Sequence, residues 1–322
     1  MIITSEQHEK YFDGYIVVDC AVRSKEIIYF SLCEDISQMD DEEDLDEIWP
    51  NRRIVYYVGT APKELQWGNV NFDSSDDYHL CIARLPQEKL IAIEDEGQVY
   101  SLGSGSQGME KRLGDWIEGG ILRGAVIRCR TIDGYPYLAG GGRTVAMRKD
   151  RNNFVPLMQG LPYDDDEDFE VAGFEDIDGF SSNDIYCVGG EGDVWHFDGT
   201  AWSQVQFPSN IDLNSVCCAG DGEVYISGYQ GTTFKGRGNK WKQIYKGEMT
   251  IPFKDLVWHG DRVWCTNDYG LWQILDGKLS VAQVDSEITV GSGHLSSYAG
   301  ILLLAGHSGA AYNENGIWHK IF

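Results

Sequence analysis

Short apolar segments recur along the second half of the chain, and each is followed by a glycine at a fixed distance. The text Asp-Ile-Tyr-Cys-Val-Gly-Gly-Glu-Gly at 184–192 recurs as Glu-Val-Tyr-Ile-Ser-Gly-Tyr-Gln-Gly at 223–231 and as Arg-Val-Trp-Cys-Thr-Asn-Asp-Tyr-Gly at 262–270. Such apolar runs, bounded by glycine, predict buried strands that end in tight turns. The repeated glycines, spaced 39 residues apart, are Gly192, Gly231, Gly270 and Gly309. The residues six places before them are Tyr186, Tyr225, Trp264 and Leu303.

Two more strands are expected after each of these segments. In the best-defined copy we predict strands at 183–188, 193–197 and 202–205. The last two are joined by an Asp-Gly pair, which a type I′ hairpin turn favours because both of its central residues have positive φ. Equivalent pairs are Asp198-Gly199, Asp276-Gly277 and Asn315-Gly316. The tryptophans just after the turns, which we expect to pack between repeats, are Trp202, Trp241 and Trp318.

A period of this length, with several short strands in each unit, predicts an all-β propeller. Weaker copies of the signature extend toward the N-terminus. We therefore predict one domain, 1–322, of seven four-stranded antiparallel blades, with six or eight as the alternatives. The predicted blades are 11–73, 76–113, 117–160, 171–207, 210–246, 250–285 and 288–322, with acidic insertions at 33–52 and 161–176.

The text at 181–190 and 194–202 resembles the blade repeats of bacterial β-propellers in the broad WD40-like and sialidase-like superfamily. The resemblance is good over 171–322 and faint over 11–160. It implies a fold and no particular activity, because propellers host hydrolases, lyases, lectins and interaction scaffolds. The chain lacks the Trp-Asp and Gly-His dipeptides that are typical of WD40 repeats. Its Asp-Gly-Thr-Ala-Trp text at 198–202 is too short for a sialidase Asp box, so sialidase catalysis is not implied.

The formal net charge of −25 changes the functional picture. Nucleic acid and anionic membranes are disfavoured as ligands, because lysine and arginine drive binding to both. A basic protein partner is favoured.

The location that we expect is the cytoplasm. The N-terminal text has no basic start followed by an apolar core, and no apolar run approaches the length of a membrane span. The eight cysteines show no CxxC pair and are expected to be reduced and largely buried.

Two acidic segments, 34–47 and 163–176, interrupt the repeat and contain no lysine or arginine. The first falls between the second and third strands of blade 1, and the second falls between blades 3 and 4. In a propeller these two kinds of connection emerge on the same face, so the insertions are expected to converge there. Taken singly, each run could be a solvated loop; together they suggest a binding surface.

The candidate site combines these carboxylates with residues of other loops on the same face. Aromatic residues could anchor a contact that the carboxylates steer, and we expect Tyr229, Tyr269 and His307 to line the channel mouth. The predicted partner-binding residues are Asp40, Asp41, Glu42, Glu43, Asp44, Asp46, Glu47, Trp49, Asp164, Asp165, Asp166, Glu167, Asp168, Tyr229, Asp268, Tyr269 and His307.

Catalytic chemistry has little support in the sequence. It holds no nucleophile elbow, zinc-protease helix or phosphate-binding loop, so we predict no catalytic residues, no metal site and no cofactor. Calcium on the acidic clusters is a minor alternative.

The leading hypothesis is a non-catalytic propeller, monomeric alone, whose acidic face captures a basic protein. Its most concrete form is an immunity protein that neutralises a bacterial toxin such as a nuclease. The alternatives are a propeller that binds or cleaves glycans at the channel mouth, and a scaffold in a larger assembly.

Overall fold

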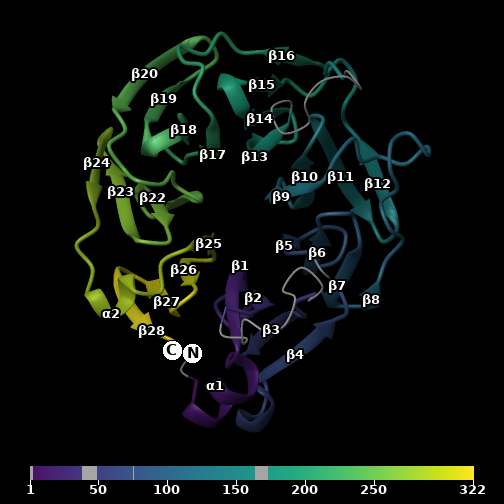
Figure 1. The fold of residues 1–322 in the computed structure, drawn as a ribbon, viewed down its shortest axis with the longest axis vertical. Coiled ribbons are helices and arrows are strands. Elements are labelled where there is room, and N and C mark those ends of the chain that lie inside the picture. The colour runs from purple at the N-terminus through teal and green to yellow at the C-terminus, as the bar shows by residue number, and fades with distance from the viewer. Residues whose placement is uncertain (1–2, 38–48, 75, 164–172) are drawn as a thin grey trace.

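A computed structural model describes residues 3–37, 49–74, 76–163 and 173–322. Seven four-stranded antiparallel sheets are arranged in a ring around a central axis, as Figure 1 shows, and each sheet is one blade. The predicted seven-bladed all-β propeller is confirmed. Among the helices of the described residues, none is long and apolar enough to cross a bilayer.

The first three blades follow the order of the chain. Blade 1 contains β1 (Tyr15–Ser24), β2 (Ile27–Glu34), β3 (Arg52–Val58) and β4 (Trp67–Phe72). Blade 2 contains β5 (Tyr78–Ala83), β6 (Lys89–Glu94), β7 (Val99–Gly103) and β8 (Gly108–Met109). Blade 3 contains β9 (Val126–Ile132), β10 (Tyr135–Gly140), β11 (Thr144–Asp150) and β12 (Asn153–Pro156).

The last four blades carry the clear repeat. Blade 4 contains β13 (Phe174–Ser181), β14 (Asp184–Gly189), β15 (Val194–Phe197) and β16 (Trp202–Gln204). Blade 5 contains β17 (Leu213–Cys218), β18 (Val224–Gly228), β19 (Thr233–Arg237) and β20 (Lys240–Tyr245). Blade 6 contains β21 (Asp255–His259), β22 (Arg262–Asn267), β23 (Gly270–Leu275) and β24 (Lys278–Val281). Blade 7 contains β25 (His294–Tyr298), β26 (Ile301–Gly306), β27 (Gly309–Glu314) and β28 (Ile317–Lys320).

In the described residues, the short helices lie before β1 or in the connections between strands. They are α1 (Ser5–Tyr11), η2 (Lys63–Leu65), η3 (Gly190–Gly192), η4 (Tyr229–Gly231) and α2 (Ser286–Thr289).

The repeated glycine has a geometric cause in blade 4. Gly192 ends the η3 turn with a φ of 74°, and a Cβ atom there would collide with the backbone carbonyl of Ser209 in the crossing to blade 5. The Gly192 N–H also donates to the Ile211 carbonyl at 2.8 Å. Only glycine combines this left-handed backbone with so close an approach.

The ring is closed by side chains rather than by a shared blade. Blade 1 consists wholly of N-terminal strands and blade 7 of C-terminal ones, and both termini lie near this junction (Figure 1). Phe12, just after α1, packs on Phe322 with ring centroids 4.3 Å apart and on Phe30 at 5.5 Å. The Tyr11 hydroxyl donates to the Trp67 carbonyl at 2.9 Å. This buried aromatic cluster joins the two ends of the chain.

Aspartates on the innermost strands join neighbouring blades. Each carboxylate accepts a backbone N–H from the innermost strand of the next blade. The pairs are Asp19 with Leu80 (2.7 Å), Asp176 with Val216 (3.0 Å), Asp178 with Cys218 (2.7 Å) and Asp255 with Leu295 (3.1 Å). The inner wall of the propeller is therefore held by polar contacts as well as by apolar packing.

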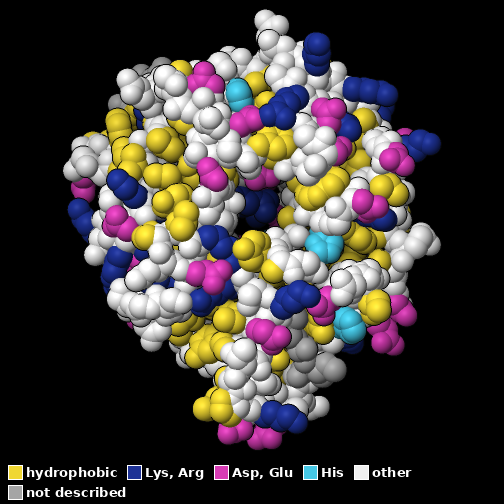
Figure 2. Space-filling model, turned by 180° about the vertical axis from the view of Figure 1, so that it is seen from behind, with side chains coloured by type: hydrophobic (Ala, Val, Ile, Leu, Met, Phe, Trp, Pro, Cys, Tyr) yellow, Lys and Arg dark blue, Asp and Glu magenta, His cyan; other side chains and the backbone are white. Residues whose placement is uncertain are grey.

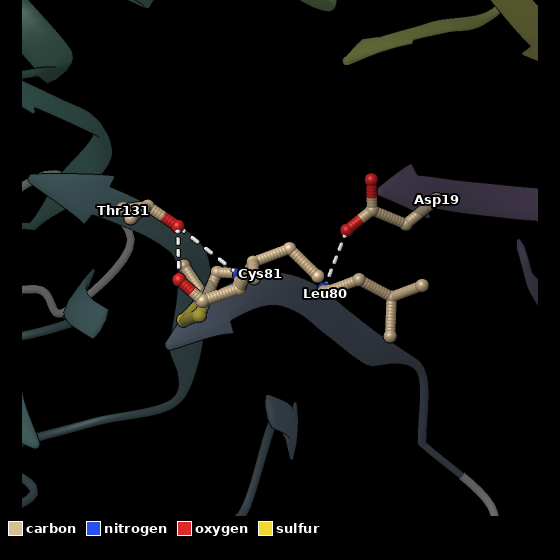
Figure 3. The surroundings of a disulfide bond; sticks show 6 residues. Asp19, Leu80, Cys81 and Thr131 are labelled. Atoms are coloured by element: carbon tan, nitrogen blue, oxygen red, sulfur yellow. Dashed lines mark hydrogen bonds between the residues drawn. A yellow bond between two sulfur atoms is a disulfide. The ribbon is translucent and has the colours of Figure 1, made fainter. Parts of the chain in front are cut away.

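One cysteine pair bridges blades 2 and 3. Cys81 of β5 and Cys129 of β9 form a disulfide, shown in Figure 3, and the other six cysteines are free. Beside it, the Thr131 hydroxyl accepts the Ile82 N–H at 3.1 Å and donates to the Ile82 carbonyl at 2.7 Å. The prediction that all eight cysteines are reduced is wrong for this pair, because the two innermost strands bring their side chains together.

Candidate protein-binding face

The strand order defines two faces of the propeller. We call the face that carries the connections between second and third strands, and between successive blades, the upper face. The opposite face, with the remaining hairpin turns, is the lower face, and it is seen in Figure 2. Because neighbouring strands are antiparallel, every connection of one kind emerges on the same face.

The predicted site residues within the described structure all lie on the upper face. They are Trp49, Tyr229, Asp268, Tyr269 and His307. The remaining predicted carboxylates lie outside the described residues. They are Asp40, Asp41, Glu42, Glu43, Asp44, Asp46, Glu47, Asp164, Asp165, Asp166, Glu167 and Asp168.

Three aromatic side chains project from these connections into solvent. Trp49 is 72% exposed, Tyr229 is 56% exposed and Tyr269 is 79% exposed. Their positions are supported by backbone hydrogen bonds in two cases. The Tyr229 N–H donates to the Asp212 carbonyl at 2.8 Å, and the Tyr269 N–H donates to Asn267 Oδ1 at 2.9 Å. Exposed aromatic rings on a fixed backbone are suited to anchoring a protein partner.

Asp268 is paired within the face. Its Oδ1 lies 2.7 Å from Lys254 Nζ, and both side chains are partly exposed. Arg143 and Asp193 form a second pair at 2.7 Å, in which both side chains are largely buried. These cations of the upper face are therefore offset locally, and the acidic insertions add negative charge beyond these pairs.

The mouth of the channel on the upper face is a cavity of about 600 Å³. Its polar lining includes His79, His294, His307, Asp19, Asp77, Arg128, Lys254 and Asp268. His79 Nε2 lies 2.8 Å from Asp95 Oδ1, and His294 Nδ1 lies 3.4 Å from Asp255 Oδ2. The structure thus brings His307 and Asp268 together at the mouth, whereas Tyr229 and Tyr269 stand outside this cavity.

Buried ion pairs form the floor of the mouth. Arg130 of β9 binds Asp176 through two hydrogen bonds, of 3.2 and 3.1 Å. It also donates to Asp255 at 3.0 Å, and Arg128 donates to the same Asp255 oxygen at 3.1 Å. Burial alone would raise the pKa of Asp255, but Arg128 and Arg130 hold that pKa well below its usual range. The carboxylate therefore stays charged and the network is structural.

An exposed turn between blades 2 and 3 was missed by the sequence reasoning. Ile117 is 80% exposed and Trp116 is 39% exposed at the tip of this turn. Two backbone hydrogen bonds of 2.7 Å close the turn: the Trp116 N–H donates to the Leu122 carbonyl, and the Gly120 N–H donates to the Asp115 carbonyl. The guanidinium of Arg123 lies 5.0 Å from the Trp116 ring centroid. The sequence feature that could have identified this turn is the apolar pair Trp116-Ile117, which stands between Gly114 and Gly119 in the connection from blade 2 to blade 3.

Carboxylates surround this turn. A cavity of about 720 Å³ beside it is lined by Asp95, Glu96, Asp115 and Glu118, with Arg112 as the one basic lining residue. Arg112 is itself paired with Glu96 at 2.5 Å. The turn thus places an apolar tip next to an excess of negative charge.

Metal binding has no support in the described part of the chain. No three His, Cys, Asp or Glu side chains in it form a group that could hold a metal ion. Calcium stays a prediction for the acidic insertions.

Comparison with solved structures supports the fold. YCF48 bound to D1 peptide is similar with a TM-score of 0.61 and 12% identity, over 93% of each chain. The WD40 β-propeller domain of Doa1 gives a TM-score of 0.57 and 12% identity, over 92% of this chain and 95% of that one. At these identities the likeness concerns the fold alone.

Comparison with characterised sequences gives a nearer relative, although no family model matches the chain. The immune protein Tsi7 of Pseudomonas aeruginosa is 32% identical over 218 residues, which are 67% of this chain and 70% of that protein. An identity of this level over most of both proteins reflects common descent. The chain belongs to the family of the immune protein Tsi7.

Proposed function

We propose that this protein is an immunity protein that inhibits a toxin by covering it with the upper face. The observation that carries this proposal is the family relationship with the immune protein Tsi7. The fold is suited to the role, because a rigid propeller holds many loops on one surface.

The chemistry of the face supports a basic toxin as partner. The net charge of −25 and two insertions without lysine or arginine favour encounter with a positive surface. Enzymes that cleave nucleic acid carry such a surface at their active site, so a nuclease-like toxin in the cytoplasm is the most concrete partner. Trp49, Tyr229, Tyr269 and Ile117 would hold the complex after encounter.

The test combines capture of the binding partner with an assay of whether the chain protects cells from that partner. Partners are captured from native extract with the intact chain and with a variant whose carboxylates in 34–47 and 164–170 are replaced by Ser and Asn. A matched control neutralises carboxylates of the lower face, such as Asp261→Asn and Asp276→Asn. Each captured protein is identified and then expressed in cells with or without the chain.

We expect a basic protein that binds the intact chain and the lower-face control but not the insertion variant. Its expression should stop growth, and co-expression of the chain should restore growth. A captured protein that is harmless, or whose toxicity the chain leaves unchanged, would contradict the proposal. Equal capture by the insertion variant would instead contradict the role of the acidic loops.

A further inference from the structure

Cys81 and Cys129 join the innermost strands of blades 2 and 3, and both residues line a cavity in the lower part of the channel. The cavity has a volume of about 570 Å³ and opens at the hollow in the centre of the lower face (Figure 2). The two residues are 4% and 3% exposed. They are packed in the channel wall, yet they lie beside a space that small reagents can enter.

Other contacts hold the seam between blades 2 and 3 whether or not the two sulfur atoms are bonded. On the inner side, the Thr131 hydroxyl bonds to both the N–H and the carbonyl of Ile82, at 3.1 and 2.7 Å (Figure 3). On the outer side, Arg148 of β11 donates to the two carboxylate oxygens of Glu110 at 3.0 and 2.7 Å, and both side chains are buried. These contacts should keep the ring folded when the cysteines are reduced.

Blade 2 has the shortest outermost strand of the seven blades. β8 spans only Gly108–Met109 and forms two register pairs with β7, Tyr100 with Met109 and Ser101 with Gly108. The other outermost strands have three to six residues. A covalent link on the innermost strand therefore stabilises the blade that has the fewest backbone pairs at its outer edge.

The bonding of this cysteine pair depends on the redox state around the protein. In the cytoplasm, which is the location proposed for the chain, thiols are kept reduced, and disulfides there are usually transient. We propose that Cys81 and Cys129 form a redox-sensitive clamp, in which a peroxide converts two thiols to the disulfide and tightens the seam between blades 2 and 3. The clamp is separate from the upper face and does not depend on toxin binding.

One hydrogen peroxide molecule balances the oxidation. The thiolate of one cysteine attacks a peroxide oxygen and the O–O bond breaks, which gives a sulfenic acid and, with the proton that the thiol released, one water. The sulfur of the other cysteine then attacks the sulfenic sulfur, and the S–S bond forms as a second water leaves. The two sulfurs are oxidised and the peroxide is reduced. A dithiol such as dithiothreitol reverses the step by exchange and is itself oxidised to a cyclic disulfide.

The test compares one preparation of the protein in two states. The protein is reduced with dithiothreitol and freed of reductant, and half of it is treated with hydrogen peroxide and then with catalase. Mass spectrometry of unreduced peptides should show the bond between Cys81 and Cys129 in the treated half alone. We expect oxidation to raise the midpoint of thermal unfolding by about 5 °C or more, as for a cross-link between residues 48 positions apart. Amide hydrogen exchange of β5 and β9 should slow.

Three variants assign the response to this pair. Cys81→Ser and Cys129→Ser each remove one sulfur and keep a side chain of similar size, so the unfolding midpoint of either variant should not rise with peroxide. Cys20→Ser is the matched control, because Cys20 is free, buried on the innermost strand of blade 1 and lines the same cavity. It should keep the full response. The comparison of the two wild-type states needs no variant, so it stands even if a variant fails to fold.

Four results would overturn the proposal. The first is equal midpoints and equal exchange in the two wild-type states. The second is a rise with peroxide that persists in Cys81→Ser and Cys129→Ser, or a bond to a different cysteine. The third is a disulfide that dithiothreitol reduces only after unfolding, because the bond would then be permanent. The fourth is loss of the fold on reduction, because the bond would then be required rather than switchable.

Discussion

Arg130 and Asp255 meet across the central channel, with Arg130 Nη2 donating to Asp255 Oδ1 at 3.0 Å. Arg130 belongs to blade 3 and Asp255 to blade 6, so this ion pair joins blades that are not neighbours in the ring. Both side chains are largely buried, at 17% and 1% exposure. The pair separates the upper mouth from the lower part of the channel and holds the two sides of the propeller together.

Removing one partner should be strongly destabilising. Asp255→Ala removes one of the two buried carboxylates that Arg128 and Arg130 share, so that only Asp176 remains for both, and it removes the acceptor of the Leu295 N–H. We expect a loss of about 3–5 kcal/mol in the free energy of unfolding, as for other broken buried pairs. Urea denaturation followed by circular dichroism measures it.

The control is Asp261→Ala, which breaks the solvent-exposed pair with Arg262. Its unfolding midpoint should stay close to that of the wild type. A similar midpoint for Asp255→Ala would show that the channel pair contributes little.

Asp178 should make stability depend on pH. Burial in the wall of the lower channel raises the pKa of its carboxyl from 3.8 to about 6. Between these values the folded protein holds a proton that the unfolded chain has released, so stability falls as pH rises from about 4 to about 6. The upper limit of this loss is about 3 kcal/mol.

Asp178→Asn removes this titration and keeps an oxygen that can accept the Cys218 N–H. The variant should gain stability relative to the wild type as pH rises through this window, with the gain levelling off above about pH 6. Urea denaturation of both proteins at several pH values measures the difference. A difference that does not change with pH would mean that Asp178 titrates near its ordinary value.

Gly192 and Gly222 have similar backbone conformations but different surroundings, so substituting each distinguishes the cost of close packing from the cost of backbone strain. Gly192 and Gly222 have φ values of 74° and 83°, but a Cβ would collide with the Ser209 carbonyl only at Gly192, and Gly222 has open space. Gly222→Ala should cost about 1 kcal/mol from the left-handed backbone alone, and Gly192→Ala should cost at least about twice as much. Thermal denaturation of the two variants gives the comparison, and equal losses would remove the packing explanation for the repeated glycine.

The local sequence pattern was sufficient to predict the blades but not the contacts that cross the central channel. The period of Gly192 and its equivalents marks the end of the connection between the second and third strands in each strong repeat. The turns themselves differ, because Gly192 and Gly231 end short helical turns with φ of 74° and 75°, whereas Gly270 and Gly309 begin β23 and β27. Trp202 packs between blades as expected, with its indole N–H donating to the Leu157 carbonyl at 2.6 Å. The contact between Arg130 and Asp255 depends on how seven blades close into a ring, which no short pattern encodes. The pairing of Cys81 with Cys129 depends on the same closure, because it joins innermost strands 48 residues apart.

The upper face was predicted from topology, but its apolar contacts were predicted only in part. Tyr229 and Tyr269 were visible because they fall inside the repeat. Ile117 lies in a crossing with no repeat around it, so the periodicity gave no reason to select it. Its importance depends on exposure, which is a property of the folded ring.

The final prediction concerns which residues of the upper face hold the partner. Tyr269 and Ile117 are 79% and 80% exposed on connections of blade 6 and of the crossing between blades 2 and 3. If both lie in the centre of the toxin interface, Tyr269→Ala and Ile117→Asp should each cost about 2 kcal/mol of binding, a loss of about 30-fold in affinity. The affinity is measured by calorimetry with the purified partner recovered by the capture experiment.

Ile317→Asp is the matched control, because Ile317 is 61% exposed at the start of β28, next to a lower-face turn. Since all three side chains are exposed, none of the variants should alter folding, and any change in affinity reports the interface. Loss of binding in Ile317→Asp with retention in the other two would place the partner on the lower face. Loss in Tyr269→Ala alone would restrict the interface to the side of the ring formed by blade 6.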